Sequence, residues 1–78
     1  MSKATQREAD RAVWLVNVVQ FTAEELGKTI SETLQLLNHH GLIEQVLAGY
    51  KILHTQGYEY MAELLSDELR KAQGVFAQ

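Results

Sequence analysis

The side chains best suited to chemistry in this chain gather in the segment YKILHTQGYEY, residues 50–60. His54 and Thr55 supply an imidazole and a hydroxyl, and Gly57 follows two residues later. Free amide groups at the start of a helix, together with the positive end of its dipole, can hold an anion. Because Lys51 is the only nearby cation and no arginine accompanies the motif, a carboxylate of a partner protein fits better than free phosphate. His54, Thr55 and Gly57 are therefore candidate partner-binding residues.

The same residues also fit a structural interpretation, in which they form a joint between two helices. Thr55 is a reasonable N-cap for a following helix, because its hydroxyl can accept a hydrogen bond from an amide of the first turn. His54 can donate to a carbonyl of the preceding turn. Glycine in a first turn costs up to about 1 kcal/mol relative to alanine, so Gly57 predicts a close approach by a helix or a ligand. We expect the structural role to dominate, with the binding role as the alternative.

Other patterns that carry chemistry are absent from the sequence. His39 and His40 are adjacent, so on a helix they point about 100° apart, and no pair of histidines has the four-residue spacing of a zinc site. The chain has no cysteine. Ser31 and Ser66 fall within predicted helices and belong to no Gly-x-Ser-x-Gly turn. We predict a protein that is not an enzyme, with no catalytic residue, no metal site and no cofactor.

Apolar residues recur every three or four positions, which is the period of helices. The first long helix is predicted at about residues 5–26, with one face made of Ala9, Ala12, Val16, Val19, Ala23 and Leu26. Trp14, Leu15, Val18 and Phe21 widen its apolar sector, so we expect this helix to be central or buried on two sides. Trp14, Val18 and Phe21 are our candidate docking residues for a second protein. The alternative is that they belong to the domain's own core, where large aromatic side chains are usually found.

Glycines divide the remainder of the chain into three further helices. Gly27 ends the first helix, and Thr29 with Glu32 forms a capping box that begins the second. Its predicted inward face consists of Ile30, Thr33, Leu34 and Leu37, and Gly41 ends it. A short third helix leads to Gly49, and the last helix follows the joint with an inward face of Tyr58, Met61, Ala62, Leu65, Leu69 and Ala72. The prediction is an all-α fold, a compact bundle of four helices, two long and two short.

Size and composition predict one ordered domain that gains from association. The chain has 78 residues, of which 46% are hydrophobic and 22% charged, with no proline. Such a composition is typical of a globular domain, and we expect a single domain over residues 1–78 with an ordered core at about 5–75. Without disulfides or thiolate metal sites, a partner subunit is the remaining common source of stability. We expect a protein partner or self-association into a homo-oligomer.

Neither a membrane nor a nucleic acid is an expected partner. No apolar run approaches the roughly 18 residues that cross a bilayer, and the start of the chain lacks the pattern of a signal peptide, which favours a cytoplasmic protein. The net charge is −3. The segment ISETLQLLNHHGLIEQVLAGYK is compatible with a helix-turn-helix, but Glu44 and Gln45 stand where cations would neutralise phosphates. A helix-turn-helix-like, DNA-associated regulator is kept as the alternative function.

The joint segment, the capped helix and LIEQVLAGY before it, and the acidic amphipathic helix after it resemble a known bacterial family, domain-of-unknown-function family 3791. The resemblance covers about residues 10–72 and rests on a Tyr-x-x-Leu-His-Thr-x-Gly core, matched here by Tyr50, Leu53, His54, Thr55 and Gly57, with Tyr60 following. It implies an all-helical fold without an assigned activity, encoded beside larger partner proteins, some toxin-like with ADP-ribosyltransferase character. We therefore predict a non-enzymatic protein-interaction module, in the form of an accessory or antitoxin-like subunit.

Overall fold

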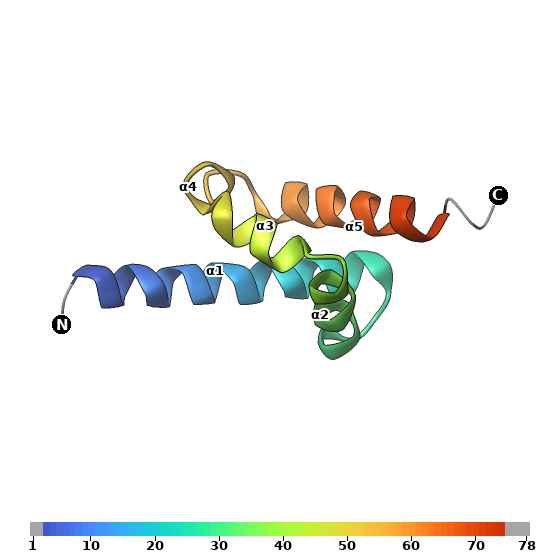
Figure 1. The fold of residues 1–78 in the computed structure, drawn as a ribbon, viewed down its shortest axis with the longest axis horizontal. Coiled ribbons are helices and arrows are strands. Elements are labelled where there is room, and N and C mark those ends of the chain that lie inside the picture. The colour runs from blue at the N-terminus through green and yellow to red at the C-terminus, as the bar shows by residue number, and fades with distance from the viewer. Residues whose placement is uncertain (1–2, 75–78) are drawn as a thin grey trace.

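One long helix lies along the molecule, and the other helices pack on its side. The computed structural model describes the backbone of residues 3–74 and the side chains of residues 8–72. This part forms α1 (Lys3–Leu26), α2 (Ile30–His39), α3 (Leu42–Ala48), α4 (Tyr50–Leu53) and α5 (Tyr58–Gly74). It measures 51 × 22 × 21 Å, with α1 running along the longest direction (Figure 1). The all-α prediction is confirmed, and residue 75, the predicted end of the ordered core, lies outside the described residues.

The structure contains one short element that the predicted bundle of four helices did not include, the single turn α4. Gly49 ends α3 as predicted, and its amide still donates to the carbonyl of Gln45 at 3.1 Å. The carbonyl of Gly49 then accepts from the amides of Ile52 and Leu53 at 3.1 and 2.8 Å, which starts a new helical turn at once. A glycine can therefore end one helix and begin the next, and the spacing of apolar residues did not reveal this second start.

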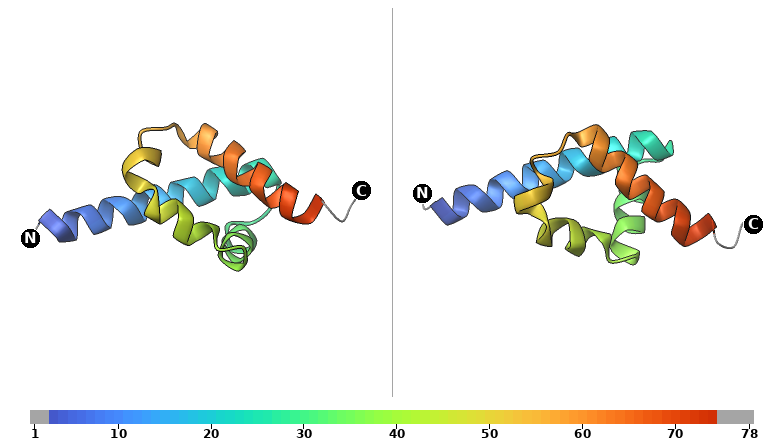
Figure 2. Two further views of the ribbon diagram at one scale, coloured as in Figure 1. Left: turned by 45° about the horizontal axis from the view of Figure 1, so that its top comes forward. Right: turned by 90° about the horizontal axis from the view of Figure 1, so that it is seen from above.

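The path of the chain brings α5 back over α1. α1 packs mainly against α5 and α2, and α2 contacts α3. In Figure 1, α3 and α4 run back along α1, from the end of α2 to the start of α5. α5 then follows the same direction as α1, and Figure 2 shows that the two helices cross obliquely. The segment from α2 to α4 is thus a return connection that leaves α5 to cover the second half of α1.

The core lies where α1, α2, α3 and α5 meet. Its buried members are Trp14, Val18, Val19, Leu37, Leu42, Val46, Met61, Leu65 and Leu69. The predicted inward positions on α5 are confirmed at Met61, Ala62, Leu65 and Leu69, which are all buried. Ile30 and Leu34 were also predicted to face inward, and this is wrong, because they are 49 and 44% exposed. Val16, on the predicted apolar face of α1, is 59% exposed. Periodicity identifies an apolar face of a helix, but the neighbouring helices decide whether that face is covered.

Local bonds at the helix ends agree with the sequence. Thr29 Oγ1 accepts from the amide of Glu32 at 3.1 Å, and the amide of Thr29 donates to Glu32 Oε1 at 3.0 Å, which confirms the capping box. Gly27 and Gly41 have φ of 68° and 70°, a left-handed conformation that favours glycine and closes α1 and α2. The hydrogen bonds that Thr29 donates hold the pKa of Glu32 below its ordinary value of 4.5.

The capping box predicts a stability that depends on pH. Glu32 has a lower pKa in the folded chain than in the unfolded one, so its ionised form stabilises the fold above about pH 4.5, and this contribution disappears as the pH falls through the folded pKa. We expect Glu32→Gln to lower the free energy of unfolding at pH 7 and to have much less effect at acidic pH. Urea unfolding of both proteins at the two pH values measures this. Glu44→Gln, in the first turn of α3, is the control, and an equal pH dependence in both variants would contradict the prediction.

Candidate functional site

His54 lies at the end of α4 and is bonded to the turn before it. Its Nδ1 lies 2.6 Å from the carbonyl oxygen of Tyr50, which also accepts the amide of His54 at 2.9 Å. A carbonyl oxygen only accepts, so the proton of a neutral His54 ring resides on Nδ1. The imidazole also stacks on the ring of Tyr50, with centroids 4.5 Å apart and planes at 17°. The expected bond from His54 to the preceding turn is confirmed.

Thr55 and Gly57 differ from their predicted roles. Thr55 does not cap α5, because its hydroxyl donates to the carbonyl of Ile52 at 2.7 Å and so closes the end of α4. α5 begins only at Tyr58, with Gly57 before it, whose carbonyl accepts the amide of Met61 at 3.1 Å. A Cβ placed on Gly57 would have no atom within 4 Å, so the predicted close approach is wrong. His54, Thr55 and Gly57 are all exposed, and their bonds serve the helix ends.

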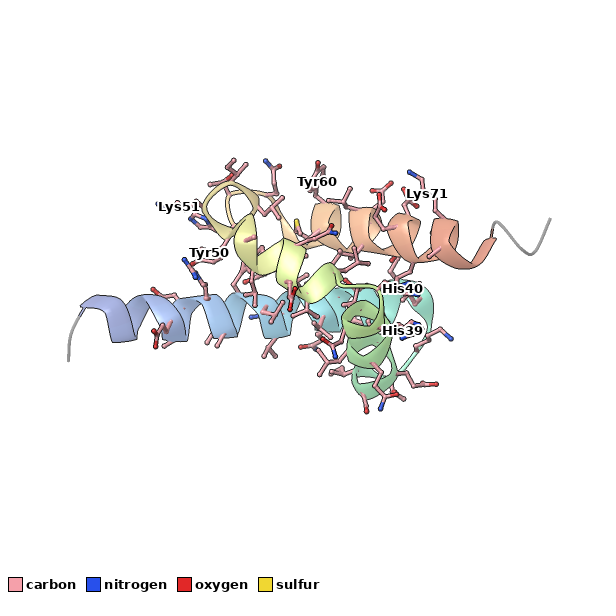
Figure 3. The ribbon with its side chains drawn as sticks, in the orientation of Figure 1. His39, His40, Tyr50, Lys51, Tyr60 and Lys71 are labelled. Carbon is pink, nitrogen blue, oxygen red and sulfur yellow. The ribbon has the colours of Figure 1, made fainter. Side chains whose placement is uncertain are left out.

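Tyr50 connects this joint to α1. Its ring meets Trp14 edge-on, with centroids 5.1 Å apart and planes at 78°, and the guanidinium of Arg11 lies 5.3 Å from its centre. Figure 3 shows Tyr50 between α4 and α1. Trp14 and His54, which the sequence offered as separate candidates, thus both contact the ring of Tyr50. An aromatic side chain held on three sides is typical of an anchor that fixes the direction of the chain.

The predicted docking residues of α1 lie mostly inside the domain. Trp14 and Val18 are 6 and 0% exposed. Phe21 is partly buried and stacks on Tyr58 of α5, with centroids 5.2 Å apart. A side chain already covered by its own chain has no surface left for a second protein, so the prediction of a docking face at Trp14 and Val18 is corrected in favour of the core alternative. The aromatic pairs of α1 instead hold α4 and α5 in place.

The joint leads to a stability prediction for His54. We expect His54→Ala and Thr55→Ala each to lower the free energy of unfolding by about 0.5–1.5 kcal/mol, since each removes one bond to a backbone carbonyl. Thermal or urea unfolding measures the change. Gln56→Ala is the control, because this exposed side chain lies in the same turn and only its backbone amide is bonded there. If His54→Ala left stability unchanged and abolished binding to a partner protein, the binding interpretation of the joint would be correct.

A shallow acidic groove lies between α1 and α5. It has a volume of about 400 Å³ and is lined by Phe21, Glu24, Glu25, Glu59, Ala62 and Glu63. Two carboxylates from each helix therefore line this space, and the ion pairs found among the described side chains lie elsewhere, at Arg70–Asp67 and Lys71–Glu68. Such a concentration of negative charge repels phosphate groups. We call this feature the acidic groove.

The residues able to bind metals are dispersed. Within the described part of the chain, no group of three or more histidine or carboxylate side chains is placed to hold a metal ion. His39 and His40 lie at the end of α2, with ring centroids 5.0 Å apart and planes at 80° (Figure 3). In the same part of the chain, no helix has both the length and the apolar character to cross a membrane.

Exposed aliphatic side chains are the surface feature that the sequence reasoning missed. Val13 and Val16 of α1 are 61 and 59% exposed, and Ile30 and Leu34 of α2 are 49 and 44% exposed. Each pair is spaced by three or four residues, so its members are neighbours on one helix face. The sequence did contain a signal for this exposure, the unusually wide apolar sector of α1. A helix that packs against the rest of its domain along one side only cannot bury so wide a sector.

Comparison with known families places the chain. The matching family model is described as a protein of unknown function (DUF3791), and it covers residues 14–71. The chain belongs to this family. Neither the curated proteins nor the solved structures gave a match to it.

The DUF3791 match includes the core and the joint. It begins at Trp14 and ends at Lys71, so it contains α2, α3 and α4, the second half of α1 and most of α5. The exposed residues 8–13 of α1 precede it. Membership in DUF3791 carries no stated activity, and a function for this domain must be argued from its surface.

Proposed function

We propose that this DUF3791 domain is a non-enzymatic protein-interaction module that binds another protein through exposed apolar faces of α1 and α2. The observation that carries this proposal is the exposure of Val13, Val16, Ile30 and Leu34, from 44 to 61%. Burying such side chains against a partner removes apolar surface from water at about 25 cal/mol per Å². The binding free energy would come from this surface, and the joint at His54 would only support the helices.

Helix propensity does not account for these residues. Valine and isoleucine are branched at Cβ and stabilise an exposed helix less than alanine, glutamate or lysine does. At Val13, Val16 and Ile30 they therefore contribute little propensity, and about half of each side chain is left exposed by the described domain. Single exposed apolar residues are common on any protein, but paired ones on one helix face are typical of a contact surface. A protein partner that covers each pair would explain why these exposed positions hold apolar residues.

The DNA-associated alternative has less support. α3 would be the reading helix, and its sequence LIEQVLA contains no lysine or arginine. Glu44 and Gln45 are exposed on it, and the acidic groove adds further negative charge. Binding to DNA depends on cations that neutralise phosphates. Within the favoured function we propose an accessory, antitoxin-like subunit, since so small a domain with dispersed reactive side chains is suited to act by binding a larger protein.

Photo-crosslinking in cells that produce the protein tests the proposal. A benzophenone amino acid is placed at Val16 or at Leu34, and at Gln35 as the control, which is exposed on the same helix as Leu34 but polar. We expect a discrete light-dependent protein adduct from Val16 and Leu34 and little from Gln35. If neither Val16 nor Leu34 forms an adduct with any protein, the proposal is wrong.

A further inference from the structure

Two imidazole rings meet at the end of α2, where the sequence alone predicts no metal site. His39 and His40 are adjacent, and adjacent positions of a helix point about 100° apart. Their rings nevertheless lie with centroids 5.0 Å apart and planes at 80°. Figure 3 shows the two side chains on the same side of α2. Each ring therefore reaches beyond its own position on the helix and contacts the other.

The ring nitrogens of this pair are available to a ligand. In the part of the chain that the structure describes, the histidine ring that makes a hydrogen bond is that of His54, whose Nδ1 is bonded to the carbonyl oxygen of Tyr50. His39 is exposed and His40 is partly exposed, so a small ion can approach the pair from solvent. Neutral imidazole is the commonest metal ligand among protein side chains.

The separation of the two rings matches that of two imidazoles bound to one metal ion. Zinc binds a histidine nitrogen at about 2.0–2.1 Å, which puts the centre of the ring about 3.2 Å from the ion. At the angles of octahedral and tetrahedral coordination, about 90° and 109°, two such centres lie about 4.5–5.2 Å apart. The observed 5.0 Å falls within this range. An ion bound by both nitrogens lies in both ring planes, and planes at 80° intersect in a line that can contain it.

The end of α2 also favours a cation. The carbonyl groups of the last turn give the C-terminal end of a helix a partial negative charge. The charged side chains that line the shallow pocket beside His39 are Lys28 and Glu32, which have opposite signs. Their charges offset each other, and the helix end therefore contributes a net attraction for a positive ion.

We propose that His39 and His40 together bind one zinc ion at the C-terminal end of α2, each through one ring nitrogen. Within the described residues, no third histidine or carboxylate is placed to join them, so water completes the coordination of the ion. Imidazole suits zinc, whereas magnesium and calcium prefer oxygen ligands. The ion links the last residue of α2 to its C-cap, directly before Gly41, whose φ of 70° closes the helix. This site is independent of the exposed apolar faces that carry the proposed function.

Titration of the purified, tag-free chain with zinc chloride tests the site. We expect calorimetry at neutral pH to give one tightly bound ion per chain. His39→Ala and His40→Ala should each raise the dissociation constant at least tenfold, since the loss of even an outer-shell partner of a metal ligand costs about 10–100-fold in affinity. His54→Ala is the matched control, because His54 caps α4 and should leave the dissociation constant unchanged. Circular dichroism establishes that all three variants are folded.

The single variants distinguish one shared ion from two separate ions. If each histidine bound zinc alone, either variant would lose one ion and would bind the other as tightly as the wild type does. A wild-type chain that binds zinc no more tightly than the single variants would therefore overturn the inference. Nuclear magnetic resonance gives a second readout, in which the ring signals of His39 and His40 should follow one common titration curve. Binding should weaken in acid, because a protonated imidazole cannot hold the ion.

The unfolded chain is the control for the geometry of the fold. His39 and His40 remain neighbours in sequence after unfolding in urea, but the fixed separation of their rings is lost. We expect the folded chain to bind zinc more tightly than the chain in urea. Equal affinity of the two states would mean that neighbouring positions in the sequence suffice, and it would overturn the assignment of a site to the folded end of α2.

Discussion

Trp14→Ala is expected to lower the free energy of unfolding by about 3–5 kcal/mol, the range for removing a buried tryptophan. Trp14 is 6% exposed, and its ring contacts that of Tyr50 at 5.1 Å. Small domains are stable by only about 5–15 kcal/mol, so this loss brings the protein close to unfolding. Urea unfolding followed by far-ultraviolet circular dichroism measures it, because Trp14 is the only tryptophan and fluorescence would be lost with it.

Two controls separate the core role of Trp14 from a docking role. Val13→Ala changes the preceding, 61% exposed residue and should alter stability by less than about 0.5 kcal/mol. Trp14→Phe keeps an aromatic ring against Tyr50 and removes the indole Nε1, a buried donor that has no hydrogen-bond partner. Its loss of stability should therefore be much smaller than that of Trp14→Ala. A Trp14→Ala protein as stable as the wild type would restore the docking interpretation.

Leu37→Ala is expected to lower the free energy of unfolding by about 2–5 kcal/mol, because it leaves a cavity at a fully packed position. Leu37 is 1% exposed and belongs to the face of α2 that meets the core. Thermal or urea unfolding measures the effect, and the lower midpoint should come without a large change in the slope against urea.

Leu34→Ala is the matched control for this second prediction. It removes the same atoms from the same helix, but Leu34 is 44% exposed. We expect its effect on stability to be well under half of that at Leu37, and its effect on partner binding to be the larger of the two. Equal losses of stability from both changes would mean that the contacts of Leu34 within the domain, and not an external partner, explain its presence.

Only part of the candidate site was accessible from sequence. The bond from His54 to the preceding turn joins groups four residues apart, and residue type with helical spacing sufficed to predict it. The Thr55 hydroxyl could bond either to an amide of the following helix or to a carbonyl of the preceding turn. The choice depended on where α5 starts, and α5 starts only at Tyr58, after Gly57. The exposed valines of α1 were missed because an apolar residue on a helix gives the same signal whether or not a neighbour covers it.

The sequence by itself determined the four longer helices and the two junctions that connect α1, α2 and α3. The capping box of Thr29 and Glu32 and the left-handed Gly27 and Gly41 depend on bonds within four residues, so the local sequence contains all the groups involved. Only the tertiary structure decided which faces are buried. Trp14 and Val18 came to lie under the other helices and Val16 did not, because the path from α2 to α4 brings α5 over one side of α1 alone. Burial is a property of the contact between distant segments, and the order of residues within one helix does not contain it.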